Sequence, residues 1–171
     1  MTPFTPIFSQ LPPQAPPLSK AVAQALAERE ITKQDILALV AEQGIYDLNE
    51  VINQLGYLFF YYAFRALNDH VLTPEEKMNA LYLKRTFGFK EGFFFQNFYR
   101  ETQTLVSKQL QLIYADNKVT EAERQHIADI QELFDLSFAQ MDEFKAVFVD
   151  KALADGANLD ELDTNLSDST I

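Results

Sequence analysis

Two stretches of this 171-residue chain repeat one another at an offset of 47 positions. DHVLTPEEK begins at Asp69 and DNKVTEAER begins at Asp116, so Thr73 pairs with Thr120. The apolar positions that follow keep the same register: Ala80, Leu83 and Phe87 pair with Ile127, Ile130 and Phe134. Since these positions share one face of a helix, the repeat predicts two similar helical hairpins related by a pseudo-two-fold axis.

Each repeat carries Thr-x-x-Glu, formed by Thr73 with Glu76 and by Thr120 with Glu123. This spacing is typical of a capping box, in which the threonine hydroxyl accepts from the third helical amide. The glutamate accepts in return from the threonine amide. We therefore expect a helix to begin directly after each threonine.

Capping does not explain Asp69 and Asp116, which lie four residues before each threonine. An aspartate at this position either closes an Asx-turn or offers oxygen to a hard cation such as Ca²⁺ or Mg²⁺. Both interpretations stay open from the residue chemistry. The four candidate metal ligands are Asp69, Glu76, Asp116 and Glu123.

Other kinds of metal site and catalytic site fail on spacing. An EF-hand that began at Asp116 would need Glu at position 127, where the chain has Ile127. Glu123 and His126 have the Glu-x-x-His spacing of di-iron bundles, but the repeat partner of His126 is Asn79. A glycine-rich phosphate loop and a nucleophile elbow are also absent, so no catalytic residue is predicted.

Hydrophobic periodicity is helical almost throughout, and no convincing strand remains. Ser19, Thr32, Thr73 and Ser137 are candidate N-caps. The expected helices are 19–29, 32–44, 48–68, 74–87, 90–115, 121–134 and 138–154. The third of these has no charge over 51–64, but polar residues and a glycine interrupt it, so we place it inside a bundle and not across a membrane. The predicted class is all-α, a compact bundle of about seven helices.

The two ends of the chain differ from this helical domain, which we assign to residues 18–155. Six of the seven prolines lie in residues 1–17, which predicts an extended arm. The arm also carries Phe4, Ile7, Phe8 and Leu11. It is therefore either a flexible tail or a segment that lies along a groove of its own subunit or of a neighbouring subunit. Residues 156–171 are acidic and predict a disordered tail.

Composition limits the classes of partner. With 25 acidic and 14 basic residues the net charge is −11, which disfavours nucleic acid and anionic membrane surfaces as partners. The chain has no cysteine, and its N-terminus lacks the pattern of a secretory signal. We therefore expect a cytoplasmic location.

The phrase LIYAD followed by NKVTEAERQHI, then by an amphipathic helix that ends in FDLS, resembles the repeated pattern of the tellurite-resistance TerB family. The resemblance covers about 51–154. It implies an all-α fold of two pseudo-symmetric halves, a stress-response or scaffold role without catalysis, and divalent-cation binding at the four acidic positions. His70 and Asn117 stand where that family usually has glycine.

Two functional hypotheses follow. The first is a non-catalytic TerB-like module that binds protein partners, with a divalent cation as a further ligand and a homodimer formed through the arm. The second is an enzyme or small-molecule carrier with an aromatic pocket. Its candidate lining residues are Tyr57, Tyr61, Tyr62, Phe93, Phe94 and Phe95. A closed cavity with converging polar groups would favour the second hypothesis, and an exposed apolar groove over a filled core the first.

Overall fold

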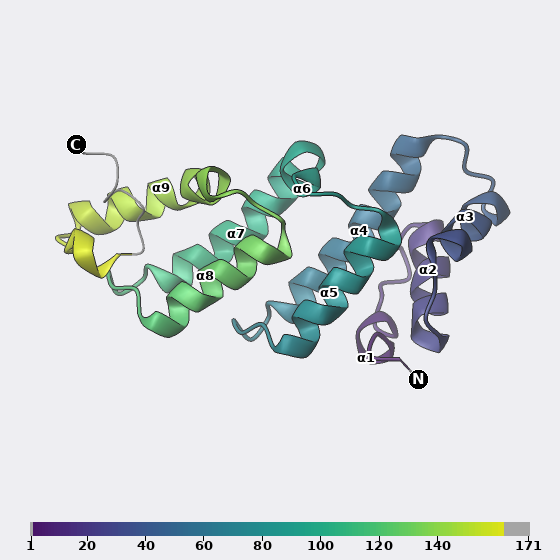
Figure 1. The fold of residues 1–171 in the computed structure, drawn as a ribbon, viewed down its shortest axis with the longest axis horizontal. Coiled ribbons are helices and arrows are strands. Elements are labelled where there is room, and N and C mark those ends of the chain that lie inside the picture. The colour runs from purple at the N-terminus through teal and green to yellow at the C-terminus, as the bar shows by residue number, and fades with distance from the viewer. Residues whose placement is uncertain (1, 163–171) are drawn as a thin grey trace. The chain divides into compact units, whose positions relative to one another are not determined.

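The computed structural model describes residues 2–162, which form nine α-helices and one 3₁₀ helix and contain no strand (Figure 1). The predicted all-α class is confirmed, although these residues form more helices than the seven expected. Contacts group the chain into two compact units. The first contains residues up to Asp69 together with Thr73–Lys90, and the second contains His70–Leu72 and the residues from Glu91 onward.

The first unit is built around one long apolar helix, α4. Its five helices are α1 (Thr5–Phe8), α2 (Pro17–Glu28), α3 (Lys33–Glu42), α4 (Leu48–Ala66) and α5 (Pro74–Phe87). Helix α4 contacts α1, α2 and α5, while α3 packs on α2 and α5. Leu58, Phe59 and Tyr62 of α4 are fully buried. The uncharged run of this helix is therefore core, as the sequence indicates.

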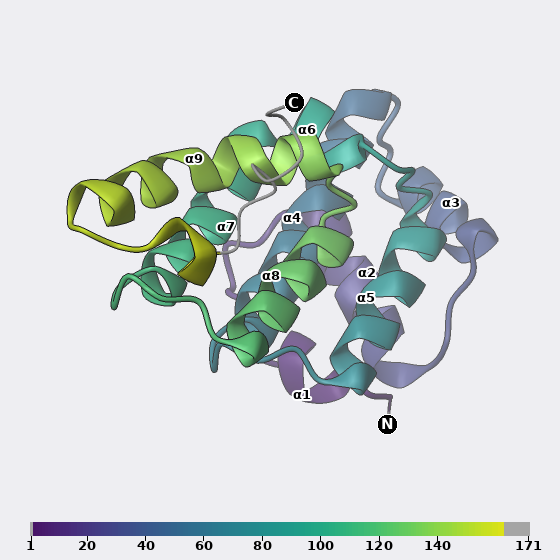
Figure 2. The ribbon, with the colours of Figure 1, turned by 60° about the vertical axis from the view of Figure 1, so that its left-hand side comes forward.

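The second unit is arranged around α7. Its helices are α6 (Phe93–Asn97), α7 (Tyr99–Ile113), α8 (Glu121–Leu133), α9 (Phe138–Ala154) and the 3₁₀ helix η1 (Leu159–Glu161). Helix α7 contacts α6, α8 and α9, and Figure 2 shows α8 and α9 following one another through a short turn. Val106, Leu110 and Ile113 of α7 are buried and form the core face of this helix.

Four predicted N-caps are confirmed. Thr32, Thr73, Thr120 and Ser137 each precede a helix and form a complete capping box. In the first repeat, the amide of Glu76 donates to Thr73 Oγ1 at 3.2 Å, and the amide of Thr73 donates to Glu76 Oε2 at 2.9 Å. Helix starts are therefore encoded locally at these positions.

The fifth expected cap, Ser19, is wrong. Helix α2 begins two residues earlier, at Pro17, and Ser19 is fully buried within it. Its hydroxyl donates to the backbone carbonyl of Gln54 on α4 at 2.7 Å. The side-chain Oε1 of Gln54 accepts from the amide of Leu18 at 2.8 Å. The start of α2 is therefore capped by a distant helix and not by its own sequence.

The single helix expected over 90–115 is also wrong, because Phe98 breaks it into α6 and α7. Phe98 leaves helical backbone geometry with φ −135° and ψ 44°. The break allows Phe94 and Phe98 both to be buried. Phe93, the first residue of α6, contacts both rings at centroid distances of 5.6 and 5.7 Å. Aromatic packing thus outweighs continuation of the helix.

Both chain ends carry more structure than expected. Thr5–Phe8 forms one helical turn instead of an extended segment, and Phe4 and Phe8 are buried. At the other end, the predicted disordered tail begins with ordered residues, since η1 follows α9 and Leu162 is buried. The amide of Val119 donates to the Glu161 carbonyl at 2.8 Å. The rest of the predicted tail, 163–171, lies outside the described residues.

None of the helices within residues 2–162 has both the length and the apolar character that a membrane crossing requires.

Candidate functional site

Two of the four predicted metal ligands, Glu76 and Glu123, are helix-capping residues in the structure. Oε2 of Glu123 accepts from the amide and the hydroxyl of Thr120, both at 2.8 Å. Oε2 of Glu76 accepts in the same way from Thr73, at 2.9 and 2.8 Å. Each carboxylate is therefore held at the start of its own helix.

The aspartates lie in the turns that precede these helices. Oδ1 of Asp116 accepts from the amide of Lys118 at 3.1 Å, which is the Asx-turn that the sequence allowed. Asp69 lies just after the end of α4. Among residues 2–162, no group of three or more His, Asp or Glu side chains is arranged to hold a metal ion. The metal prediction therefore depends on the family resemblance alone.

His70 and Asn117 adopt a backbone conformation that favours glycine. His70 has φ 63° and Asn117 has φ 62°, both in the left-handed region. Asparagine and histidine are among the residues that tolerate this region better than most. The tight turn thus persists in both repeats without glycine.

A polar contact between paired helices recurs at the offset of 47. In the first hairpin the Tyr62 hydroxyl donates to the Glu76 carbonyl at 3.0 Å and lies beside the Asn79 side chain. In the second hairpin, Gln109 stands at the position of Tyr62 and His126 at that of Asn79. His126 Nε2 lies 3.0 Å from Gln109 Oε1. Burial raises the pKa of Tyr62 well above its usual range, so it remains a neutral hydrogen-bond donor.

Gln109 connects both histidines of the chain. His70 Nδ1 lies 3.0 Å from the same Gln109 Oε1 that His126 approaches. His126 is buried and His70 is exposed. The alignment of Gln109 with Tyr62 at the offset of 47 is the one sign of this cluster in the sequence.

Of the six aromatic residues named for an alternative ligand pocket, two are fully buried and four are partly exposed. Tyr62 and Phe94 are fully buried. Phe94 makes an edge contact with Phe134 at 5.8 Å, and Phe95 contacts Tyr99 and Phe144. These rings form core contacts within their own units.

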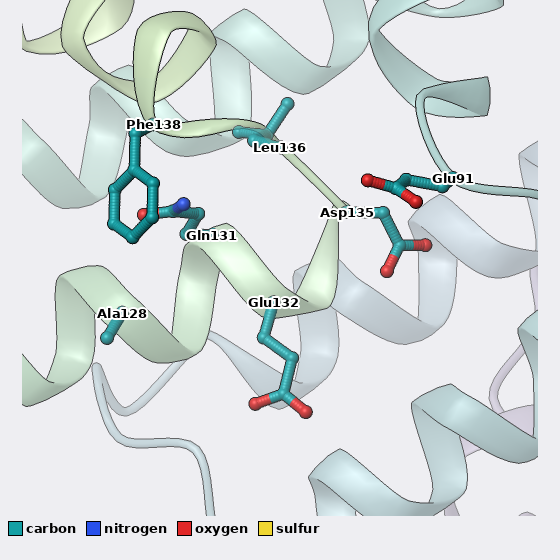
Figure 3. A pocket seen from close by; sticks show the side chains of 7 residues that line it. All are labelled: Glu91, Ala128, Gln131, Glu132, Asp135, Leu136 and Phe138. Atoms are coloured by element: carbon teal, nitrogen blue, oxygen red, sulfur yellow. The ribbon is translucent and has the colours of Figure 1, made fainter.

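A surface pocket of about 440 Å³ lies in the second unit, where α8 ends and α9 begins (Figure 3). Its lining residues are Glu91, Ala128, Gln131, Glu132, Asp135, Leu136 and Phe138. Phe138 is 72% exposed, and Figure 3 shows its ring turned toward the part of α8 that carries Ala128 and Gln131. The pocket therefore presents an aromatic ring to solvent beside a depression in the surface.

The lining of this pocket combines acidic, amide and apolar side chains. Three carboxylates, one amide and three apolar side chains line it, and none of the seven residues is Ser, Cys, Lys or His. The sequence analysis did not identify this pocket. Phe138 occupies the first position of α9, directly after the cap, where the expected helix gives no indication of exposure.

Comparison with protein-family models, with curated protein sequences and with solved structures found no match to this chain.

Proposed function

We propose that this chain is a non-catalytic helical module that binds protein partners, with the two pseudo-symmetric hairpins and the stress-response or scaffold role that its resemblance to the TerB family implies. The observation that carries the proposal is the exposed Phe138 at the pocket of the second unit. A large exposed aromatic ring beside a surface depression is typical of an anchor point for a protein partner. The cytoplasmic location belongs to the same proposal.

The recurring local geometry supports the pseudo-symmetric part of this proposal. At the ends of α4 and α7, the amides of Leu67 and Tyr114 donate to the carbonyls of Ala63 and Leu110, each at 2.9 Å. Turns with left-handed His70 and Asn117 follow, and identical capping boxes start the next helices. Divalent-cation binding at the acidic turns stays a prediction from the resemblance.

The experiment is affinity capture from the native organism, with and without chelator, followed by cross-linking of the captured complex. Phe138→Asp should abolish capture of any partner that binds through the pocket. A matched control is Val147→Asp, since Val147 also lies on α9 and is 65% exposed. A partner retained by Phe138→Asp and lost by Val147→Asp would contradict the assignment of the pocket, and the absence of any specific partner would contradict the function.

A further inference from the structure

Residues 2–10 are the part of the predicted N-terminal arm that precedes the linker, and from here on the arm means these residues. The centre of the arm is aromatic. Phe4 and Phe8 are one helical turn apart, stack at 5.7 Å, and are 4% and 5% exposed. Phe4 lies 6.0 Å from Tyr62 on α4 and 5.6 Å from Tyr82 on α5, measured between ring centroids. Phe8 lies 6.5 Å from Tyr62. Two phenylalanines of the arm are therefore recognised by two tyrosines of the first unit.

One end of the arm caps a helix. The Thr2 hydroxyl donates to the Leu26 carbonyl, and the Thr5 hydroxyl donates to the Ala27 carbonyl at 2.8 Å. Both carbonyls belong to the last turn of α2, where carbonyls have no donor within the helix. The arm therefore supplies hydrogen bonds that the end of α2 needs.

The other end of the arm is held by two residues of α4 that are one turn apart. The Tyr61 hydroxyl donates to the Gln10 carbonyl, and Arg65 Nη2 donates to Gln10 Oε1, each at 2.7 Å. These hydrogen bonds hold Gln10, the last residue of the arm, by both its backbone and its side chain. The arm is thus recognised at both ends and in the middle.

The backbone of the arm closes its hydrogen bonds within the arm itself. The amides of Ile7 and Phe8 donate to the Phe4 carbonyl at 3.2 and 2.9 Å, and Ser9 donates to Thr5 at 3.1 Å. The contacts with α2, α4 and α5 described above all use at least one side chain. An arm from another chain could therefore make the same contacts without disturbing any backbone hydrogen-bond ladder.

The arm is joined to α2 by 11–16, whose sequence LPPQAP contains three prolines. In the structure this linker turns back on itself, with the amide of Ala15 donating to the Pro12 carbonyl at 2.9 Å, so opening the turn would carry the arm away from its own chain. We propose that the surface of α2, α4 and α5 beneath the arm is a recognition site for the arm of a second copy of this chain, so that two copies exchange arms reciprocally. Exchange preserves every contact named above, which makes it a low-cost route to a dimer.

In the natural chain, the protein concentration decides whether an arm docks on its own chain or on a second copy. A short linker presents its own arm at an effective concentration of about millimolar, so exchange competes only near that concentration. Removing Pro12, Pro13 and Gln14 removes this turn and leaves three linker residues, so an arm should no longer fold back onto its own surface. The buried Ala15 is retained in this variant.

The test is light scattering on the full chain without Pro12, Pro13 and Gln14. We expect a mass twice that of one chain at micromolar concentration. The same deletion combined with Phe4→Ala and Phe8→Ala should return the mass to one chain. A folded monomer from the deletion alone, judged by circular dichroism, would overturn the proposal, as would a dimer that survives loss of both phenylalanines.

A second measurement keeps the proposal testable if the deleted chain does not fold. A synthetic peptide of residues 2–11 is added at millimolar concentration to the natural chain labelled with ¹⁵N. Displacement of the natural arm should change the amide resonances of Thr5 and Phe8, and a peptide with alanine at both phenylalanine positions should leave them unchanged. Unchanged resonances with the natural peptide would overturn the proposal, because the surface would not accept an arm in trans.

This inference is independent of the pocket near Phe138. A partner captured through Phe138 with no exchange of arms would leave the proposed function intact and remove only the inference about the arm. Conversely, exchange of arms without any captured partner would remove the proposed function alone.

Discussion

Gly88 and Asp135 lie 47 positions apart and end their helices in the same way. Gly88 has φ 75° and Asp135 has φ 49°, both left-handed. The next amides, of Phe89 and Leu136, donate to the carbonyls of Lys84 and Gln131, each at 2.9 Å. This is the hydrogen bond of a Schellman motif, so the repeat extends through the end of each second helix.

Gly88→Ala should destabilise the protein by about 1 kcal/mol, because a left-handed backbone is unfavourable for a residue with a Cβ atom. No atom lies within 4 Å of a Cβ built at Gly88, so the cost is conformational and not steric. Urea unfolding measures it. Gly88→Asn is the matched control and should cost less, since asparagine tolerates this region. Equal losses in both variants would contradict the conformational explanation.

Removing a capping hydroxyl should weaken either repeat. Thr73→Ala and Thr120→Ala should each lower the free energy of unfolding by about 1 kcal/mol, because each hydroxyl satisfies a helix-end amide. Thr104→Ala is the control, since Thr104 lies on the exposed face of α7 and donates only to Arg100. We expect no loss there, because alanine has the higher helix propensity. A loss at position 104 equal to the other two would refute the role of the caps.

Acid should remove the contribution of Asp35 to the start of α3. The hydrogen bond from Arg29 at 2.7 Å, with further bonds from Thr32, holds the pKa of Asp35 well below its ordinary value of 3.8. A carboxyl with a lowered folded pKa stabilises the fold above its unfolded pKa, and that contribution is lost as the pH falls through the folded value. Asp35→Asn should therefore melt earlier than the natural chain at pH 7, with a difference that shrinks below about pH 4. A difference that is constant from pH 7 to pH 2 would contradict this linkage.

Calorimetric titration separates the two interpretations of the acidic turns. The resemblance to the TerB family predicts that Ca²⁺, Mg²⁺ or Mn²⁺ at millimolar concentration raises the melting temperature of chelator-treated protein. An unchanged melting temperature would mean that Glu76 and Glu123 act only as the helix caps that their hydrogen bonds make them. If a cation binds the folded chain, the transition rises by RT ln(1 + [L]/Kd) in free energy. A rise that disappears in Asp116→Asn with Glu123→Gln would establish the metal site that the family resemblance implies.

Truncating one arm residue should be costly. Phe8→Ala should lower the free energy of unfolding by about 3 kcal/mol, because a buried aromatic ring is removed. Ile7→Ala is the control in the same helical turn, where the side chain is only partly buried. The urea midpoint measures both. A loss below about 1 kcal/mol at Phe8 would show that the arm is not part of the stable fold.

Local signals in the sequence predict most helix starts, and contacts between distant residues explain the errors. Thr73 and Thr120 cap their helices because every group in a capping box lies within four residues. Ser19 looks like such a cap, yet its hydroxyl donates to Gln54, 35 positions away. The break at Phe98 likewise follows from where neighbouring rings pack, which a helical period does not encode.

In the candidate sites, too, the local features are predictable from sequence and the features that depend on distant residues are not. The Asx-turn at Asp116 was among the predicted alternatives because it is local. The pocket beside Phe138 was missed, because the turn between α8 and α9 decides which side of α9 faces solvent. Gln109 was missed because its two histidine partners come from separate turns of the chain.

Helix α2 depends on other segments at both ends. Gln54 satisfies the amide of Leu18, and Thr2 and Thr5 satisfy carbonyls of its last turn. A helix of 12 residues is marginal in isolation, and here its terminal groups find partners only after α4 and the arm have come into place. We therefore expect α2 to form during refolding only after α4 has formed, and its amides to exchange with solvent hydrogen more readily once the arm detaches.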